Sequence, residues 1–156
     1  MNLKRDFPRI PFYPNFWQWA KWGEKLMQLH IAYEEVEPWP LQRVDVKDEK
    51  SRRAGLAPKA MLKSDKDLGI IQLDSETQLT GVPVAAWDYK LGNRSALEWI
   101  LDQYKEKAPK DATIREKFNT YRFADHKAYV IDLLKCVMRV SIETMTVTEE
   151  MRAEKR

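Results

Sequence analysis

The most informative stretch of this chain is Tyr89-Lys90-Leu91-Gly92-Asn93-Arg94-Ser95-Ala96-Leu97-Glu98-Trp99, which predicts a glycine turn followed directly by a capped helix. Ser95 followed three residues later by Glu98 is a capping box, which predicts that a helix begins at Ala96. Gly92 can adopt the left-handed conformation that a tight turn needs. Apolar residues then recur at three- and four-residue spacing, so one face of this helix is predicted to be buried.

Polar residues gather around this helix start. Lys90, Asn93 and Arg94 precede the cap, and the partial positive charge of a helix N-terminus favours an anion such as a DNA phosphate. A glycine turn before a capped helix is also a common purely structural feature. Both interpretations stand at this point.

The residues before the turn predict a small antiparallel sheet. Short runs at 59–63, 70–73 and 77–80 are separated by turn-forming residues, and a last strand is predicted from the alternation of Trp87, Tyr89 and Leu91. The charged segment 45–58 is expected to be a mobile surface loop, with a phosphate contact as the weaker alternative.

Three main helices are predicted around this sheet. The first is capped by Asn15 and ends near Glu35; the others begin at Ala96 and at a cap on Asp125, and Asp111 caps a short helix between them. The inner face of the last helix is predicted to consist of Val130, Ile131, Leu134, Val137, Met138, Ser141 and Met145. The inner stripe of the first helix is expected to consist of Phe16, Trp19, Ala20, Gly23, Leu26, Met27 and His30. We therefore expect an α+β fold in a single domain, 1–156, with an extended entry at 1–13 and a frayed, charged tail at 148–156.

Composition narrows the class of protein. A chain of 156 residues with 44% hydrophobic content can bury one core. No apolar run is long enough to span a membrane and no signal peptide is seen, so we expect a cytoplasmic protein. The single cysteine, Cys136, lies in an apolar run and is predicted to be a buried small hydrophobe.

Charge gives a weak signal. The formal net charge is +3, and residues 41–127 hold the whole surplus, with 17 Lys or Arg against 14 Asp or Glu. A small surplus creates a basic face only if the acidic residues lie elsewhere, and a mixed solvated surface is the ordinary alternative.

Patterns typical of catalysis are not found in this sequence. It has neither a phosphate-binding loop, nor a dinucleotide glycine fingerprint, nor a Gly-x-Ser-x-Gly elbow. Its two histidines, His30 and His126, offer little for a metal site. Asp-x-Lys, part of a nuclease pattern, occurs three times, but the further carboxylates that would hold a metal are not specified. We expect a chain with no catalytic activity and no cofactor of its own.

Several separated motifs occur in order along the chain. They are Pro8-Arg9-Ile10-Pro11-Phe12-Tyr13; Phe16-Trp17-Gln18-Trp19-Ala20, continuing through Leu26-Met27, Leu29-His30 and Tyr33-Glu34; the stretch from Trp87 to Trp99; and Ile114-Arg115-Glu116-Lys117-Phe118-Asn119-Thr120-Tyr121-Arg122-Phe123. Together they resemble the C-terminal specificity domain of type ISP restriction-modification enzymes, over about 7–145.

The resemblance implies a role within a large prokaryotic enzyme in which a nuclease, a helicase-like motor and an adenine methyltransferase precede a target-recognition domain. This chain would be the last of these parts, binding double-stranded DNA and positioning the methyltransferase domain on its adenine. S-adenosylmethionine, ATP and a catalytic metal would belong to the other parts. Whether the chain is a fragment or a stand-alone product stays open.

The DNA contacts are expected on two polar loops. The predicted residues are Lys90, Asn93 and Arg94 at the first loop, and Arg115, Lys117, Asn119, Tyr121 and Arg122 at the second. Arg115 and Lys117 can instead form a solvated helix face, and Tyr121 can anchor its loop to the core. The alternative function is a protein-interaction module in which the aromatic first helix docks to another subunit and no DNA is bound.

Overall fold

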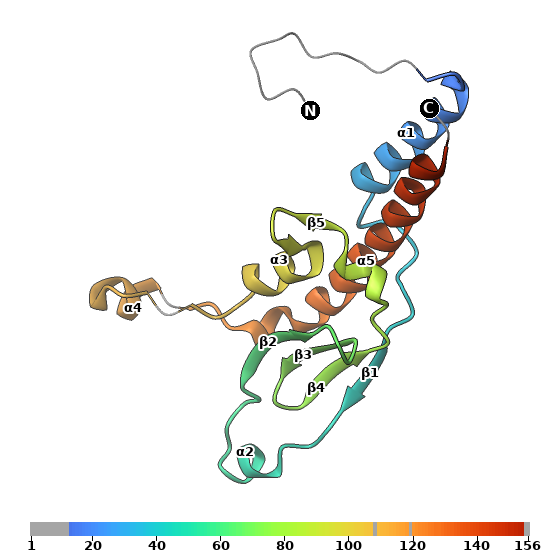
Figure 1. Cartoon of the computed structure of the whole chain (residues 1–156). Helices are drawn as coiled ribbons and strands as arrows, with labels where there is room; N and C mark the ends of the chain where they lie inside the picture. Colours follow the sequence, from blue (N-terminus) through green and yellow to red (C-terminus); the bar gives the residue numbers. More distant parts are fainter. Residues whose placement is uncertain (1–12, 108, 119, 155–156) are drawn as a thin grey trace.

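The computed structural model describes residues 13–107, 109–118 and 120–154. Within them, three longer helices and a four-stranded antiparallel sheet form an α+β fold, which confirms the expected class (Figure 1). The longer helices are α1 (Phe16–Ile31), α3 (Ala96–Gln103) and α5 (Phe123–Ala153). The predicted entry segment lies outside the described residues except for Tyr13, whose ring stacks on Trp19 at a centroid distance of 3.8 Å.

The other main elements pack on α5, whose 31 residues span about 46 Å. α1 lies along its C-terminal half, and the sheet and α3 lie nearer its N-terminal half (Figure 1). The predicted inner face is confirmed for Val130, Leu134 and Met138, which are fully buried.

Both ends of α5 differ from the prediction. Asp125 does not cap it: the helix begins at Phe123, whose backbone N–H donates to Glu106 Oε1 at 2.8 Å and whose ring is buried. At the other end α5 continues through Ala153, within the segment 148–156 that was expected to fray, and residues 155 and 156 lie outside the described residues. In this segment Glu150 accepts from Trp22 Nε1 of α1 at 2.9 Å.

α1 runs antiparallel to α5 and packs through a face shifted from the predicted stripe, of which Trp19 and Leu26 are half-buried. Trp22 and Leu29 are buried, whereas Phe16 and Met27 of the predicted stripe are more than half exposed. Apolar residues surround much of this helix, so their spacing alone does not choose a face. Asn15 lies at the N-cap position but makes no side-chain capping bond, and the helix ends at Ile31, before the predicted Glu35.

The sheet has the strand order β1-β4-β3-β2 and is antiparallel throughout. The predicted meander is confirmed as β2 (Ala60–Asp65), β3 (Ile70–Asp74) and β4 (Thr77–Thr80). β1 (Gln42–Asp45) was not predicted, because all four of its residues are exposed and show no alternation of burial.

β2 contains a bulge, next to which one side chain is buried and the following one is exposed. The register of β2 with β3 shifts between Ala60 and Lys63, and Leu62 has a φ of 47°. A positive φ is strained for a leucine, but here it accompanies a side chain that is 1% exposed. Lys63, the next residue, remains exposed.

Shorter elements connect these layers. They are α2 (Glu49–Arg53) in the expected surface loop, the 3-10 helix η1 (Val84–Trp87), β5 (Lys90–Leu91), β6 (Arg94–Ser95) and α4 (Ala112–Phe118). The predicted last strand does lead into the glycine turn, but only as β5; its start was wrong, since Trp87 ends η1 with its ring buried against the core. α4 projects away from the rest of the molecule (Figure 1).

Candidate nucleic-acid interface

The β5–β6 hairpin brings the first group of predicted residues to the start of α3. Gly92 has a φ of 66°, as predicted for the turn. The Ser95 hydroxyl accepts from the Glu98 N–H at 3.3 Å, and the Glu98 carboxylate accepts from the Ser95 N–H at 2.8 Å. The capping box is therefore confirmed, with Ser95 buried and the neighbouring Arg94 exposed.

Arg94 belongs to a cluster of cations around Asp102. Its Nη1 lies 3.4 Å from Asp102 Oδ2, and its guanidinium lies 5.5 Å from the centroid of the Trp99 ring. The Nζ atoms of Lys107 and Lys105 lie 3.3 Å and 4.0 Å from the same carboxylate. The hydrogen bond from Lys107, followed by the charges of all three cations, holds the pKa of Asp102 below its usual value. Three cations around one carboxylate leave an excess of positive charge.

A cavity of about 340 Å³ lies beside this cluster, between β2 and α3. Lys63, Arg94 and Lys105 line it together with the carboxylates of Glu98 and Asp102. Because the Arg94–Asp102 pair is partly exposed, exchanging it for a pair with a phosphate costs little. We call this cavity the basic pocket, because three cations line it against two carboxylates.

Lys90 and Asn93 lie apart from the basic pocket. Lys90 Nζ is 3.8 Å from Asp88 Oδ1, and Lys90 lines an apolar groove that Arg94 does not line. Asn93 is exposed in the hairpin turn. The structure therefore divides the first predicted group.

The second predicted group lies on and around the projecting α4. Asp111 Oδ1 accepts from the Ile114 N–H at 3.0 Å, so the predicted cap is confirmed. Arg115 donates to the carbonyls of Pro109 and Lys110, both at 3.1 Å, and closes its own loop. Lys117 is exposed, and Asn119 lies outside the described residues.

Tyr121 and Arg122 join this loop to α5. The Tyr121 hydroxyl donates to the Tyr104 carbonyl at 2.9 Å, and its ring stacks on His126 at 5.3 Å. Burial, above all, raises the pKa of Tyr121. Arg122 donates to the Tyr121 carbonyl at 2.8 Å. In this structure Tyr121 has the anchoring contacts of the second interpretation.

The sequence matches a known family over most of its length. The Type ISP C-terminal specificity domain model matches residues 1–133. The chain belongs to this family. No match to the specificity domain is found among curated proteins.

Three solved structures contain a similar domain. DrdV, in the cryo-EM structure of its DNA complex, is 57% identical to the specificity domain with a TM-score of 0.87, over 99% of this chain and 16% of the DrdV chain. The Type ISP enzyme LlaGI, a nuclease-deletion mutant with a DNA substrate mimic, is 29% identical with a TM-score of 0.67, over 96% and 14%. The ATP-dependent Type ISP enzyme LlaBIII, bound to DNA, is 26% identical with a TM-score of 0.67, over 96% and 9%. The specificity domain thus spans at most about a sixth of these chains.

A second surface of the specificity domain is apolar. A groove of about 540 Å³ is lined by residues of α1, the β5–β6 hairpin, α3 and α5. Leu91 is 74% exposed on its rim, and Trp99 is also exposed. His30 Nε2 and the Tyr89 hydroxyl lie 2.7 Å apart at its edge. We call this surface the apolar groove.

Sequence reasoning missed three cations of the specificity domain near Asp102. They are Lys63, Lys105 and Lys107. Lys63 is 31 positions from Arg94, and only the bulge in β2 and the packing of β2 on α3 bring the two together. Lys105 and Lys107 follow the end of α3 closely, so the pair of basic residues at this helix end could have indicated a cationic cluster.

Two negative findings concern the part of the specificity domain that the structure describes. Over residues 13–107, 109–118 and 120–154, no three His, Cys, Asp or Glu side chains lie together in a way that could hold a metal ion. In the same ranges, no helix is long and apolar enough to cross a membrane.

Proposed function

We propose that this chain is the DNA target-recognition domain of a restriction-modification enzyme. The observation that carries the proposal is its similarity, at 57% identity over 99% of its length, to a domain of DrdV in a DNA complex. The basic pocket supports it independently, because it offers Lys63, Arg94 and Lys105 to an anion. Phosphate contacts of this kind fix the register of a protein on a duplex.

The proposed roles of the predicted residues follow their surroundings. Arg94 would bind a phosphate in the basic pocket. Asn93 on the hairpin and Lys117 on α4 are exposed and would reach bases or backbone, while Arg115, Tyr121 and Arg122 would hold the α4 loop in place. Lys90 and Asn119 remain proposed contacts of lower rank, because Lys90 pairs with Asp88 and Asn119 is not described.

The domain would have no catalytic activity of its own. In this proposal it works in the cytoplasm with an adenine methyltransferase domain, which it positions on the target base. S-adenosylmethionine, ATP and metal would be bound by other parts of such an enzyme.

The apolar groove favours a second candidate function, a protein-interaction module that binds no DNA. A concave apolar surface with exposed Leu91 and Trp99 is typical of a docking site. The two functions differ in one measurable property, the affinity of the 156-residue chain for duplex DNA.

The experiment is a titration of fluorescent duplex DNA with the full chain between about 50 and 200 mM salt. The proposal predicts binding that weakens steeply with salt, because phosphate contacts release counterions. Leu91→Ser, an uncharged polar substitution at an exposed position of the apolar groove, should leave this binding nearly unchanged. If the chain does not bind duplex DNA even at the lowest salt, DNA recognition by this chain is wrong and the docking function is favoured.

A further inference from the structure

The connection between β1 and β2, residues 46–59, is long, charged and lacks a core of its own. Among its described side chains none is buried, and Val46 and Leu56 are more than half exposed. Ordering a loop of this length costs conformational entropy that apolar burial does not offset here. Specific polar contacts must therefore hold it.

This loop also carries the charge surplus of the chain. Residues 46–59 contain five Lys or Arg against two Asp or Glu, a surplus equal to the formal net charge of +3 of the whole chain. All other residues together are balanced. The loop is therefore a basic segment in a chain whose remaining formal charges cancel.

One carboxylate, that of Glu76 in the β3–β4 turn, holds the first half of the loop. Glu76 Oε1 accepts from the Arg52 Nε at 2.8 Å and from the Asp48 N–H at 3.0 Å, while Oε2 accepts from Arg52 Nη2 at 3.3 Å. The Glu76 carbonyl also accepts from the Val46 N–H at 2.7 Å. The Glu76 side chain is 13% exposed, and the hydrogen bond from Arg52, first of all, lowers its pKa.

The second half of the loop is held by the adjacent Ser75. Its hydroxyl accepts from the Lys59 N–H at 3.2 Å, and its own N–H donates to the Lys59 carbonyl at 2.9 Å. Both ends of the loop are thus bound to the same β3–β4 turn.

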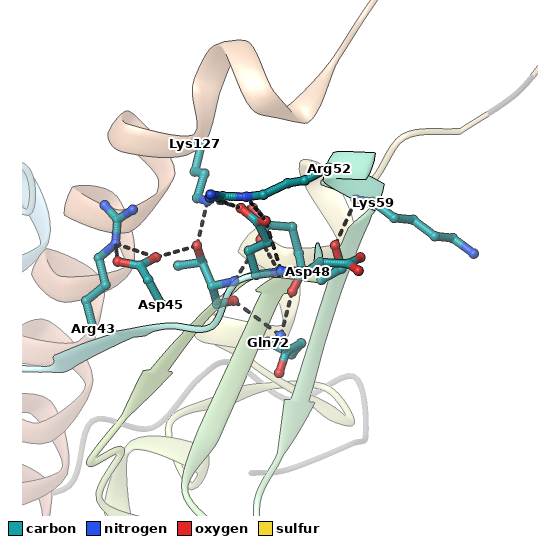
Figure 2. A network of polar contacts seen from close by, with 11 residues as sticks. Arg43, Asp45, Asp48, Arg52, Lys59, Gln72 and Lys127 are labelled. Carbon is teal, nitrogen blue, oxygen red and sulfur yellow. Dashed lines mark hydrogen bonds and ion pairs between the residues drawn. The ribbon is translucent and has the colours of Figure 1, made fainter. Parts of the chain in front are cut away.

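The β3–β4 turn is in turn fixed to α5 through a buried ion pair. Asp74 is 3% exposed; its Oδ1 accepts from the N–H groups of Glu76 and Thr77, and its Oδ2 lies 2.7 Å from Lys127 Nζ. Lys127 also donates to Thr77 Oγ1, which donates to Asp45 at the end of β1 (Figure 2). A continuous set of polar contacts therefore leads from α5 to the basic loop.

The contacts leave several cations of the loop facing solvent. Arg52 is neutralised by Glu76, and the exposed Arg53 pairs with the exposed Glu49 at 3.4 Å. Lys47 and Lys59 are exposed. Lys59 immediately precedes edge strand β2, on which Lys63 lines the basic pocket. The loop and the basic pocket are therefore consecutive along this edge of the sheet.

We propose that residues 46–59 form a second contact with the DNA backbone, and that Glu76 is the residue that positions it. This inference rests on the proposed function and adds a site and a positioning role to it. The anchored loop presents Lys47, Arg53 and Lys59 to phosphates. Because the loop is ordered before DNA binds, less entropy is lost on binding.

The first test removes two cations of the loop. In the full chain, Lys47→Ala with Lys59→Ala should lower the slope of log affinity against log salt by about 2, close to 0.9 for each lost phosphate contact. The matched control, Lys21→Ala with Arg152→Ala, removes two exposed cations of α1 and α5 and should leave the slope nearly unchanged. Equal slopes for the loop variant and the wild-type chain would overturn the inference.

The second test separates positioning from general stability. Glu76→Ala should weaken binding about fivefold and speed amide exchange over residues 46–58, while Glu76→Gln, which keeps an acceptor oxygen, should lose less. Glu143→Ala removes a carboxylate from the Lys25–Glu143 pair between α1 and α5 and serves as the stability control. In the Lys47→Ala/Arg53→Ala/Lys59→Ala background, which lacks all three cations, Glu76→Ala should cause little further loss of affinity. A full additional fivefold loss there would show that Glu76 does not act through these cations.

The outcomes distinguish the two proposals. If the wild-type chain binds DNA and all loop variants bind it with the same affinity, the proposed function stands and the role of the loop is rejected. A wild-type chain that binds no duplex at low salt rejects the proposed function and this inference with it.

Discussion

Two polar loops flank α3, and they differ in how they contact the core. The β5–β6 hairpin before α3 is joined to the core through the buried Ser95. The α4 loop after α3 projects from the molecule (Figure 1), and its Arg115 bonds to carbonyls of its own loop. Both have a turn, a capped helix and cations in sequence. The hairpin brings Arg94 into a pocket with cations from β2 and from the end of α3.

The comparison shows that the burial of a helix cap and the partners of an arginine depend on the surrounding elements. Ser95 and Asp111 make the same kind of N-cap bond, but one lies in the core and the other on an exposed helix. Likewise Arg94 lines the basic pocket, whereas Arg115 donates hydrogen bonds to backbone carbonyls. The following predictions test these differences in order of expected effect.

Removing the buried cap should have the largest effect. Ser95→Ala takes away both the acceptor for the Glu98 N–H and the donor to its carboxylate at 3.0 Å, and we expect a loss of about 2 kcal/mol in the free energy of unfolding. Urea unfolding measures it. Asp111→Ala is the matched control and should cost less than about 0.5 kcal/mol. Equal losses at the two caps would contradict the distinction between the loops.

Removing the pocket arginine should weaken DNA binding. Arg94→Ala is expected to lower duplex affinity about tenfold and the salt slope by about 1, because one charge-assisted phosphate contact is lost. Anisotropy titrations over a range of salt check this. An unchanged affinity in Arg94→Ala and in Arg122→Ala would leave no support for DNA contact by either loop.

The anchor of the α4 loop should contribute to stability. Tyr121→Phe removes the hydrogen bond to the Tyr104 carbonyl but keeps the ring, and we expect a loss of about 1 kcal/mol in the free energy of unfolding. Tyr13→Phe, which also removes one hydroxyl, serves as the control. If Tyr121 binds DNA bases instead, affinity will fall and stability will stay unchanged.

Acid should weaken the hairpin anchor in a defined direction. Burial opposes the charge of Glu98, but hydrogen bonds from the Ser95 N–H, Lys66 and the Ser95 hydroxyl together lower its pKa below 4.5. The stabilisation is therefore present above pH 4.5 and is lost as the pH falls through the lower pKa of the folded state. Unfolding curves of wild type and Glu98→Gln from neutral to acid pH should converge. Curves that stay parallel would exclude this linkage.

The smallest effect is expected at Arg115. Because its guanidinium closes the loop between Pro109 and α4, Arg115→Ala should change duplex affinity by less than about twofold and leave the salt slope unchanged. Lys117→Ala, at an exposed position on the same helix, is its companion. A loss in Arg115→Ala as large as that in Arg94→Ala would show that DNA binding rearranges the α4 loop.

The sequence predicted the elements that depend on close neighbours. The capping box at Ser95 and the cap at Asp111 act over three residues, and the strands of the meander alternate with turn-forming residues. The inner face of α5 follows from the three- and four-residue spacing of apolar residues along the helix itself. All of these could be found because the interactions that decide them lie within one or two turns of chain.

The sequence also determined the family, since separated motifs in order carry more information than any single motif. Only the tertiary structure decided which face of the aromatic α1 packs, and that Lys63 meets Arg94 across the basic pocket. It likewise decided that Glu76 holds Arg52, 24 residues away. These contacts depend on the packing of elements that are distant in sequence, and on a bulge in β2 that local propensity does not specify.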